Sequence, residues 1–203
     1  EIAQAALPSI TPVGMAALLP GAERSFAVIE GNGEPCSVVD GVPVGWSNGK
    51  PKRIAHLKQR VPDVVVLNLL DVITSKPDDL KAKLQGAAPV VITSEGIDNA
   101  GEHDNERKAS NSRADMEREL AVIEKAIRVL SKTELQVPLE RFVITADHGY
   151  LHFPVDRNAG MKIDPPDGKM LKQERRCWLG HPSAVKPPSI EIHPASLGYG
   201  NDG

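Results

Sequence analysis

The 203-residue sequence has few aromatic residues, few cysteines and no long apolar run, and each shortage excludes a class of protein. Aromatic residues make up 3% of the chain, too few to predict a stacking platform for single-stranded nucleic acid. Cys36 and Cys177 are isolated thiols, so neither a disulfide framework nor a cysteine zinc site is indicated. No apolar run approaches the roughly 20 residues that span a bilayer, and no signal peptide is recognisable at the start. We expect a protein of the reducing cytoplasm with no membrane partner.

What is present is typical of a globular domain. Hydrophobic residues make up 40% of the chain, charged residues make up 25%, and the formal net charge is -3. That charge argues against a broadly basic nucleic-acid surface but leaves room for a local basic channel. The length suits one domain, spanning residues 1–203. The chain opens Glu-Ile-Ala-Gln and closes Gly-Asn-Asp-Gly, so we expect both ends to be cut from something longer.

An Asp-His-Gly step after an apolar run is the feature around which function is predicted. The run at 142–146 is β-branched and aromatic, which favours a buried parallel strand. Asp147 and His148 would then follow the carboxyl end of that strand, where open α/β sheets bind ligands. A carboxylate and an imidazole together suit zinc or manganese. The alternative is that Asp147 caps a turn and His148 is an ordinary surface residue.

Thr11 and Pro12 are predicted to start a short apolar helix that ends before Pro20-Gly21. The hydroxyl of Thr11 can take the N-cap, and a proline is tolerated at the first helical position. A helix amino terminus is also where an anion can be held. Thr11 is therefore either an anion-site residue or a cap alone.

Four further segments have a local pattern. Residues 25–29 and 36–40 flank a glycine-rich loop and predict a β-hairpin; that loop lacks the strand-to-helix context of a phosphate loop. The basic stretch at 42–62 predicts a surface helix, with a solvated face favoured over a phosphate-contacting patch. Residues 64–73 are ambiguous between strand and helix, and a helix is predicted at 78–85.

The second half of the chain predicts one βαβ unit. A strand at 89–93, a helix at 115–131 and the strand at 142–146 would form a right-handed crossover with parallel strands. Asp98 follows the first of these strands, so we expect it to converge with Asp147 at one sheet edge. A solvated acidic loop is the alternative for the segment that contains Asp98. The helix is predicted to bury Met116, Leu120, Ile123, Ile127 and Leu130.

Taken together, these patterns predict an α/β fold with a mostly parallel sheet, flanking helices and a small β-hairpin insertion. Prolines dominate residues 154–203, which predicts a loop-rich tail with a short strand at 175–179.

Three stretches, in this order, resemble the PglZ domain family of the alkaline phosphatase superfamily. They are the residues Pro-Ser-Ile-Thr-Pro-Val-Gly-Met-Ala-Ala-Leu-Leu-Pro at 8–20, Ile-Asp-Asn-Ala-Gly-Glu at 97–102 and Ile-Thr-Ala-Asp-His-Gly-Tyr-Leu at 144–151. The closing Leu-Gly-Tyr-Gly-Asn-Asp-Gly at 197–203 is also similar to that family. Together the stretches span most of the chain.

The resemblance implies an alkaline-phosphatase-like core and a site for two divalent metal ions, with zinc first and manganese or magnesium as alternatives. Thr11 falls where the family places a nucleophile or metal-coordinating hydroxyl. Asp147 and His148 fall on ligands of one metal, and Asp98 falls on a ligand of the other. Glu102 stands where many superfamily members have histidine, so either Glu102 ligates or His103 does.

Two departures accompany the resemblance. In the superfamily, one aspartate ligand comes from a strand that precedes the threonine helix, and this sequence has no counterpart to it. A further histidine ligand normally follows a region that is similar to residues 154–203, and it too has no counterpart here. The 203-residue piece is therefore expected to be inactive by itself.

The function implied is metal-dependent phosphoester hydrolysis, as a phosphodiesterase or nuclease-like component of bacterial phage defence of the BREX type. Its partners would be a phosphoester, a nucleic acid among the candidates, and other proteins of the defence system. The alternative is a scaffold or interaction domain that keeps the fold without chemistry.

Overall fold

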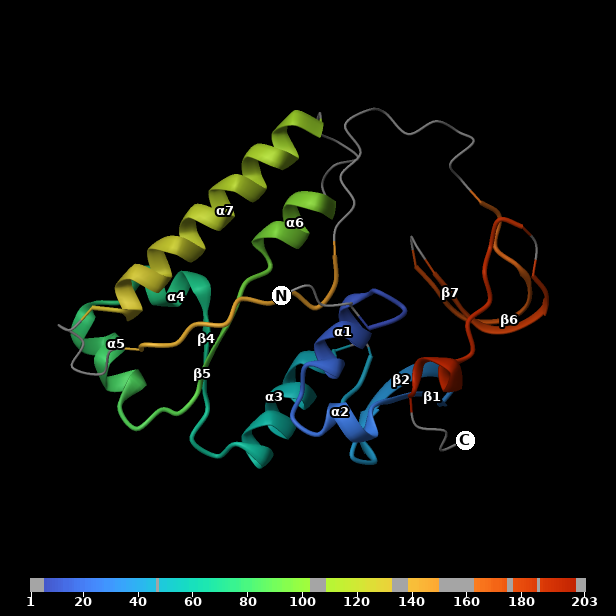
Figure 1. The fold of residues 1–203 in the computed structure, drawn as a ribbon, viewed down its shortest axis with the longest axis horizontal. Helices are drawn as coiled ribbons and strands as arrows, with labels where there is room; N and C mark the ends of the chain where they lie inside the picture. Colours follow the sequence, from blue (N-terminus) through green and yellow to red (C-terminus); the bar gives the residue numbers. More distant parts are fainter. Residues whose placement is uncertain are drawn as a thin grey trace. The chain divides into compact units, whose positions relative to one another are not determined.

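The computed structural model describes residues 6–46, 48–102, 109–132, 139–149, 163–174, 177–185 and 187–199. The chain forms two compact units (Figure 1). The first unit comprises Glu1–Arg60, Ala146–Gly149 and Arg157–Gly203, and the second comprises Val61–Thr145 and Tyr150–Asp156. Each unit has a hydrophobic core of its own.

The first unit begins with two short helices and a three-stranded antiparallel sheet. Helix α1 (Thr11–Ala17) and helix α2 (Ala22–Ser25) are separated by a turn at Pro20-Gly21. Strands β1 (Ala27–Gly31), β2 (Glu34–Val39) and β3 (Val42–Pro43) then pair in sequence order. The helix predicted after Thr11 and the β-hairpin predicted at 25–40 are both confirmed.

The β1–β2 turn has the backbone geometry of a tight hairpin. Gly31 pairs with Glu34, which leaves Asn32 and Gly33 as the two-residue loop. Both loop residues have positive φ values, 56° and 80°, as the turn type that matches strand twist requires. Asparagine and glycine are the residues that adopt this conformation at least cost.

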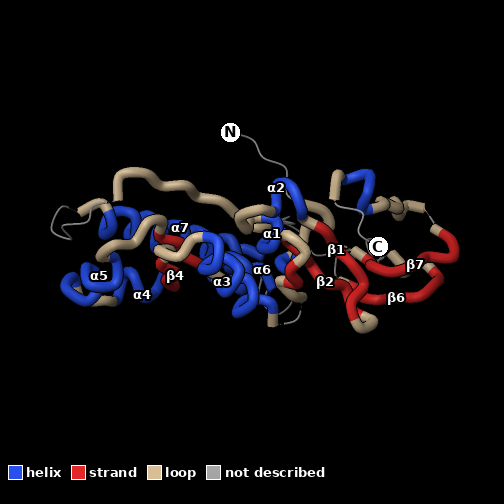
Figure 2. The backbone as a smooth tube through the Cα atoms, turned by 90° about the horizontal axis from the view of Figure 1, so that it is seen from below, coloured by secondary structure: helices blue, strands red, loops and turns tan. Residues whose placement is uncertain are grey.

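The basic stretch forms helix α3 (Gly49–Arg60), which confirms the surface helix predicted there. The tail contains more regular structure than its prolines indicate. Strands β6 (Asp167–Gln173) and β7 (Trp178–Ala184) form an antiparallel hairpin (Figure 2), followed by the 3-10 helix η4 (Pro194–Leu197). The strand predicted at 175–179 thus begins later, at Trp178. Its extent follows from pairing with β6, which local periodicity does not reveal.

Glu30 of β1 connects the β6–β7 hairpin to the rest of the first unit. Lys169 Nζ lies 2.7 Å from Glu30 Oε1, and His181 Nε2 lies 3.1 Å from Oε2. These two side chains, Lys169 first, hold the pKa of Glu30 below its ordinary value. The tail is therefore attached to the sheet by charge as well as by packing.

The core of the first unit surrounds α1. Val13, Val39 and Val44 are completely buried there, and burying one such side chain stabilises a fold by about 1.5–3 kcal/mol. The buried members of this core are Ile10, Val13, Ala16, Leu19, Ala22, Phe26, Val39, Val44 and Trp46. Because α1 contributes two of them, Val13 and Ala16, and its N-cap Ile10 is a third, the position of α1 in the unit is fixed by packing rather than by its seven residues of helix alone.

In the second unit, the ambiguous segment at 64–73 divides into a strand and a helix. Strand β4 (Val65–Asn68) leads directly into α4 (Leu69–Thr74), and the Asn68 side chain accepts a hydrogen bond from Leu70 N at 2.9 Å. Helix α5 (Pro77–Leu84) follows, close to its predicted bounds.

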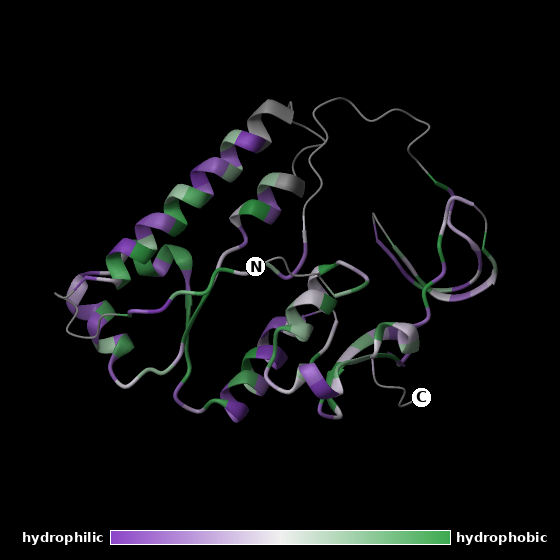
Figure 3. Ribbon diagram, viewed as in Figure 1, coloured by the Kyte–Doolittle hydropathy of each residue, from purple (hydrophilic) through white to green (hydrophobic). Residues whose placement is uncertain are grey.

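Strand β5 (Val90–Thr93) returns to pair with β4 in parallel. Both strands are hydrophobic along most of their length (Figure 3). The parallel crossover of this unit is therefore β4–α4–α5–β5.

Two helices follow β5 (Figure 1). Helix α6 (Gly96–Glu102) occupies the segment for which an acidic loop was predicted, and α7 (Ala109–Leu130) packs against α4 and α6. The predicted face of α7 is partly wrong: Leu120 is 54% exposed, whereas Ala126 is buried. The face on the core is Val122, Ile123, Ala126, Val129 and Leu130. The small side chain of Ala126 permits close helix packing, which a search for large apolar residues overlooks.

The strand predicted at 142–146 is wrong. These residues carry no strand, and Val143 and Ile144 are 83% and 69% exposed. A strand requires a hydrogen-bonded partner, and high β-propensity does not provide one. The βαβ unit predicted from β5 through α7 to this segment is therefore not formed.

The fold is mixed α/β, as the sequence predicts at that level. Across the residues described, β4 and β5 form a parallel pair, while the sheets β1–β2–β3 and β6–β7 are antiparallel. A mostly parallel sheet stays a prediction. Among the helices of these residues, none combines the length and apolar character needed to cross a membrane.

The turn at Asp40 leads to a prediction about acid stability. Ser25 Oγ donates to Asp40 Oδ1 at 2.6 Å, and Arg60 contacts the other oxygen. The Ser25 hydrogen bond, followed by the charge of Arg60, holds the pKa of Asp40 below its ordinary value. A lowered folded-state pKa stabilises the fold above the unfolded value of about 3.9, and this contribution disappears as pH falls through the folded value.

We therefore expect Asp40→Asn to lower the urea midpoint at pH 7 and to lower it less near pH 3, where part of the contribution has already been lost. Asparagine tolerates the positive φ of 51° at this position, so backbone strain is not the cause. Urea unfolding of both proteins at the two pH values measures the difference. An equal loss at pH 7 and pH 3 would contradict the electrostatic explanation.

Candidate functional site

Thr11 contacts His148 across 137 residues of sequence. The distance from Thr11 Oγ1 to His148 Nε2 is 3.1 Å. Thr11 is the first residue of α1, Ile10 is the N-cap, and no side chain makes a capping hydrogen bond there. The interpretation of Thr11 as a cap alone is therefore wrong, because its hydroxyl meets an imidazole instead.

The orientation of the His148 ring follows from its second nitrogen. Nδ1 lies 3.1 Å from the carbonyl oxygen of Gly149, which can only accept, so the proton sits on Nδ1. In the neutral ring, Nε2 then presents a lone pair to Thr11 Oγ1. Such a lone pair can accept the hydroxyl proton or bind a metal ion.

Asp147 brings a carboxylate to the same nitrogen. Its Oδ2 lies 3.6 Å from His148 Nε2, and the two side chains are only 21% and 10% exposed. A hydroxyl, an imidazole and a carboxylate thus meet within the first unit. The interpretation of His148 as an ordinary surface residue is wrong.

Gly14 explains how the Asp147–His148 segment approaches α1. A Cβ atom at Gly14 would lie 2.0 Å from the carbonyl oxygen of Asp147 and 2.6 Å from its carbonyl carbon. Gly14 lies three residues after Thr11, nearly one helical turn, so both face the same segment. The absence of a side chain at Gly14 therefore positions Asp147 and His148 beside Thr11.

Arg53 of α3 supplies positive charge near these groups. Burial lowers the pKa of the Arg53 guanidinium from its ordinary value, and the charge of Asp147 acts in the opposite direction. Arg53 and Asp147 thus form a cation and an anion that interact within the first unit.

These side chains fit part of a divalent metal site. Carboxylate oxygen, imidazole nitrogen and a hydroxyl are ligands that zinc accepts, and the lone pair on His148 Nε2 has the required direction. Within the residues that the structure describes, no group of three or more His, Cys, Asp or Glu side chains is arranged around a common point. Asp147 and His148 would be the protein ligands contributed by this unit.

The other predicted ligands belong to the second unit. Asp98 lies in the first turn of α6, directly after β5, as its place behind a strand predicts. Glu102 is the last residue of that helix. The Glu102 side chain and His103 lie outside the part of the chain that the structure describes. Their role as ligands, and the convergence of Asp98 with Asp147, stay predictions.

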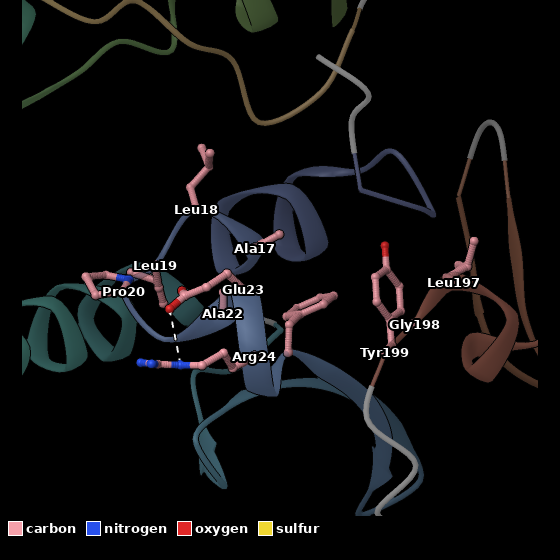
Figure 4. A pocket seen from close by; sticks show the side chains of 11 residues that line it. Ala17, Leu18, Leu19, Pro20, Ala22, Glu23, Arg24, Leu197, Gly198 and Tyr199 are labelled. Atoms are coloured by element: carbon pink, nitrogen blue, oxygen red, sulfur yellow. Dashed lines mark ion pairs between the residues drawn. The ribbon is translucent and has the colours of Figure 1, made fainter.

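A separate pocket of about 560 Å³ lies at the other end of α1 (Figure 4). Its wall is mostly apolar, and the Phe26 and Tyr199 rings meet edge to face with centroids 4.7 Å apart. Burial raises the pKa of Tyr199, whose hydroxyl accepts a hydrogen bond from Leu7 N at 2.7 Å. The residues lining it are Ala17, Leu18, Leu19, Pro20, Ala22, Glu23, Arg24, Phe26, Leu197, Gly198 and Tyr199. Thr11, Asp147 and His148 are not among them.

The comparison with protein families identifies the family of the chain. The family described as the BREX system PglZ alkaline phosphatase-like domain matches residues 1–202 of the 203. The chain belongs to the PglZ family. No curated protein and no solved structure matches it. The resemblance carried by the three short stretches is therefore confirmed.

Two residues of this PglZ domain that shape the site were not predicted from the sequence. Gly14 had a signal, since it follows Thr11 by nearly one turn and a glycine within a helix often marks a close backbone approach. Arg53 had a weaker one: it lies in the basic stretch where a phosphate-contacting patch was the alternative to the favoured solvated face, and the sequence did not single it out from its neighbours. The structure distinguishes it from its exposed neighbour Lys52.

Proposed function

We propose that this PglZ domain is the hydrolytic domain of a metal-dependent phosphoester hydrolase in phage defence. The observation that carries the proposal is the 3.1 Å contact between Thr11 Oγ1 and His148 Nε2, with the Asp147 carboxylate beside it. A hydroxyl nucleophile requires activation by a base or a metal ion, and this arrangement offers ligands for one. The BREX association of the family makes a nucleic-acid phosphodiester the substrate class we propose.

In the proposed reaction, the Thr11 hydroxyl loses its proton to solvent and its oxygen attacks phosphorus. The bond from phosphorus to the leaving oxygen of the ester breaks, that oxygen departs as the alcohol, and water then hydrolyses the phosphothreonine to regenerate Thr11. Asp147 and His148 hold a divalent ion, zinc in first place, and Gly14 fixes their distance from the hydroxyl. When bound, the ion supplies positive charge that lowers the pKa of a hydroxyl and stabilises phosphoryl oxygens. His148 keeps its Nε2 lone pair directed at the site because Nδ1 donates to Gly149.

The complete proposal includes a second divalent ion. Asp98 and either Glu102 or His103 are its proposed ligands, on the basis of the motif in which they stand. Manganese and magnesium are alternatives to zinc. We further propose a cytoplasmic location and other proteins of the defence system as partners.

One observation favours a second function, that of a scaffold without chemistry. Glu102 occupies a position where many members of the superfamily have histidine. A PglZ domain with an altered ligand set could retain the fold and act through binding alone.

Asp147→Asn tests the hydrolase proposal. We expect zinc binding to weaken at least about tenfold, because an amide is a poorer ligand than a carboxylate and carries no charge. Elemental analysis and hydrolysis of bis(p-nitrophenyl) phosphate should be measured together, on the 203-residue chain and on a longer protein that contains it. The matched control is Asp63→Asn, an exposed aspartate in a turn of the second unit.

Metal-dependent turnover that Asp147→Asn abolishes and Asp63→Asn leaves unchanged would support the hydrolase. A longer protein that is free of metal and inactive would favour the scaffold. Turnover that persists in Asp147→Asn would contradict the proposed role of Asp147.

A further inference from the structure

Two of the charged donors of Arg53 have no hydrogen-bond partner among the residues that the structure describes. Its Nε and Nη1 atoms are buried, and neither has a hydrogen-bond acceptor in the part of the chain that the structure describes. Buried guanidinium donors are normally satisfied, since an unmade hydrogen bond to a charged group is costly. An unsatisfied pair of guanidinium donors therefore calls for an oxygen ligand.

The packing around α3 holds the guanidinium in this position. Gly49 lies one turn before Arg53, and a Cβ atom there would be 2.4 Å from Arg53 Nη1 and 3.0 Å from the Val44 carbonyl oxygen. Helical side chains lean toward the amino terminus of their helix, which is the direction in which Gly49 leaves space. The guanidinium is thus held among the first turns of α3 instead of extending into solvent, as Lys52 and Lys58 do.

Helix packing places Arg53 in the element next to the one that carries Thr11, since α3 packs against α1. Asp147 interacts with it electrostatically, and Asp147 is adjacent to the imidazole that contacts Thr11. A planar guanidinium with unused donors matches the oxygens of a phosphoryl group.

We propose that Arg53 is an anion-binding residue that takes a phosphoryl oxygen of the substrate beside Thr11. The identity of that substrate rests on the proposed function, but the binding of phosphate itself does not require turnover. A purely structural arginine is the competing explanation. It would stabilise the unit through its stem and through Asp147 without affinity for anions.

The experiment is a calorimetric titration of the zinc-loaded chain with inorganic phosphate, at fixed ionic strength. Arg53→Met retains most of the stem and removes the charge, whereas Arg53→Lys retains the charge and removes the fork of donors. The matched control is Lys58→Met, which removes one exposed positive charge from the same helix. Circular dichroism establishes that each variant is folded.

We expect phosphate to bind at least about tenfold more weakly to Arg53→Met, about two- to tenfold more weakly to Arg53→Lys, and within about twofold of wild type to Lys58→Met. Should Arg53→Met not fold, the lysine variant decides. Three results would overturn the proposal. They are an Arg53→Lys variant that binds phosphate as tightly as wild type, equal losses of phosphate affinity in Arg53→Met and Lys58→Met, and a wild-type chain that does not bind phosphate.

Failure of the hydrolase proposal would be seen separately. If the chain binds phosphate through Arg53 but never cleaves an ester, the proposed anion site is supported and the hydrolase proposal is wrong. The opposite result is also distinguishable. If turnover depends on Thr11 but Arg53→Met binds phosphate as tightly as wild type, the hydrolase proposal stands and the proposed role of Arg53 is wrong.

Discussion

Replacing Thr11 by alanine is expected to lower phosphodiester turnover by at least about a thousandfold, because the substitution removes the only atom proposed to attack phosphorus. Stability should change little. The Thr11 side chain does not cap α1, and alanine has a higher helix propensity than threonine. Initial rates with bis(p-nitrophenyl) phosphate, measured on a longer protein that contains the 203 residues, and a thermal midpoint for each variant separate the two effects.

Thr11→Ser is the matched control for this prediction. Serine retains a hydroxyl at the same position, so it can still approach His148 Nε2, and part of the turnover should remain. Thr11→Val is the complementary variant, since it conserves the shape and removes the hydroxyl. If valine were as active as threonine, the nucleophile would have to be another group, and the contact with His148 would be structural.

Gly14→Ala is expected to disrupt the site and to destabilise the first unit. An alanine Cβ would lie 2.0 Å from a backbone oxygen of Asp147, closer than two atoms can pack, so α1 or the Asp147 segment must move. Overpacking of this kind costs about 1–3 kcal/mol, and the gain in helix propensity from glycine to alanine offsets at most about 1 kcal/mol of it. Chemical denaturation measures the loss, and zinc affinity reports the displacement of Asp147.

Gly31→Ala provides the comparison for Gly14→Ala. A Cβ atom at Gly31 would meet only the Cys36 side chain at 3.5 Å, an ordinary contact, and its φ is not in the left-handed region. We expect this variant to remain within about 0.5 kcal/mol of wild type, as surface substitutions usually do. Equal stability and equal zinc affinity in the two variants would contradict the close approach at Gly14.

The sequence predicted those elements that local chemistry determines. The Asn32-Gly33 turn specifies its own hairpin, and Thr11-Pro12 specifies a helix start to within one residue. The strand at 142–146 failed because propensity was the only evidence for it. A strand forms only where a second segment pairs with it, and the local sequence does not predict where that second segment lies.

The candidate site shows the same limit. Asp147 and His148 were selected because they follow an apolar run, and Thr11 because it stands at a helix start; the family resemblance then assigned all three to one site. The contact between them could not be derived, since it depends on how α1 packs against a segment 137 residues away. Gly14 matters because it has no side chain where Asp147 approaches, and Arg53 matters because its guanidinium is buried. Neither property can be predicted from composition or periodicity.

The long separation between Thr11 and His148 has a consequence for the timing of synthesis. After Thr11 has been polymerised, a further 137 residues must be added before its partner exists, which takes about 7 to 27 s at about 5 to 20 residues per second. The core around α1 also draws on Leu179 and Tyr199, near the end of the chain. A ribosome-bound chain therefore carries the nucleophile long before it carries the groups that would activate it. If the domain cleaves phosphodiesters, its cleavage is withheld while the 137 residues between Thr11 and His148 are being added.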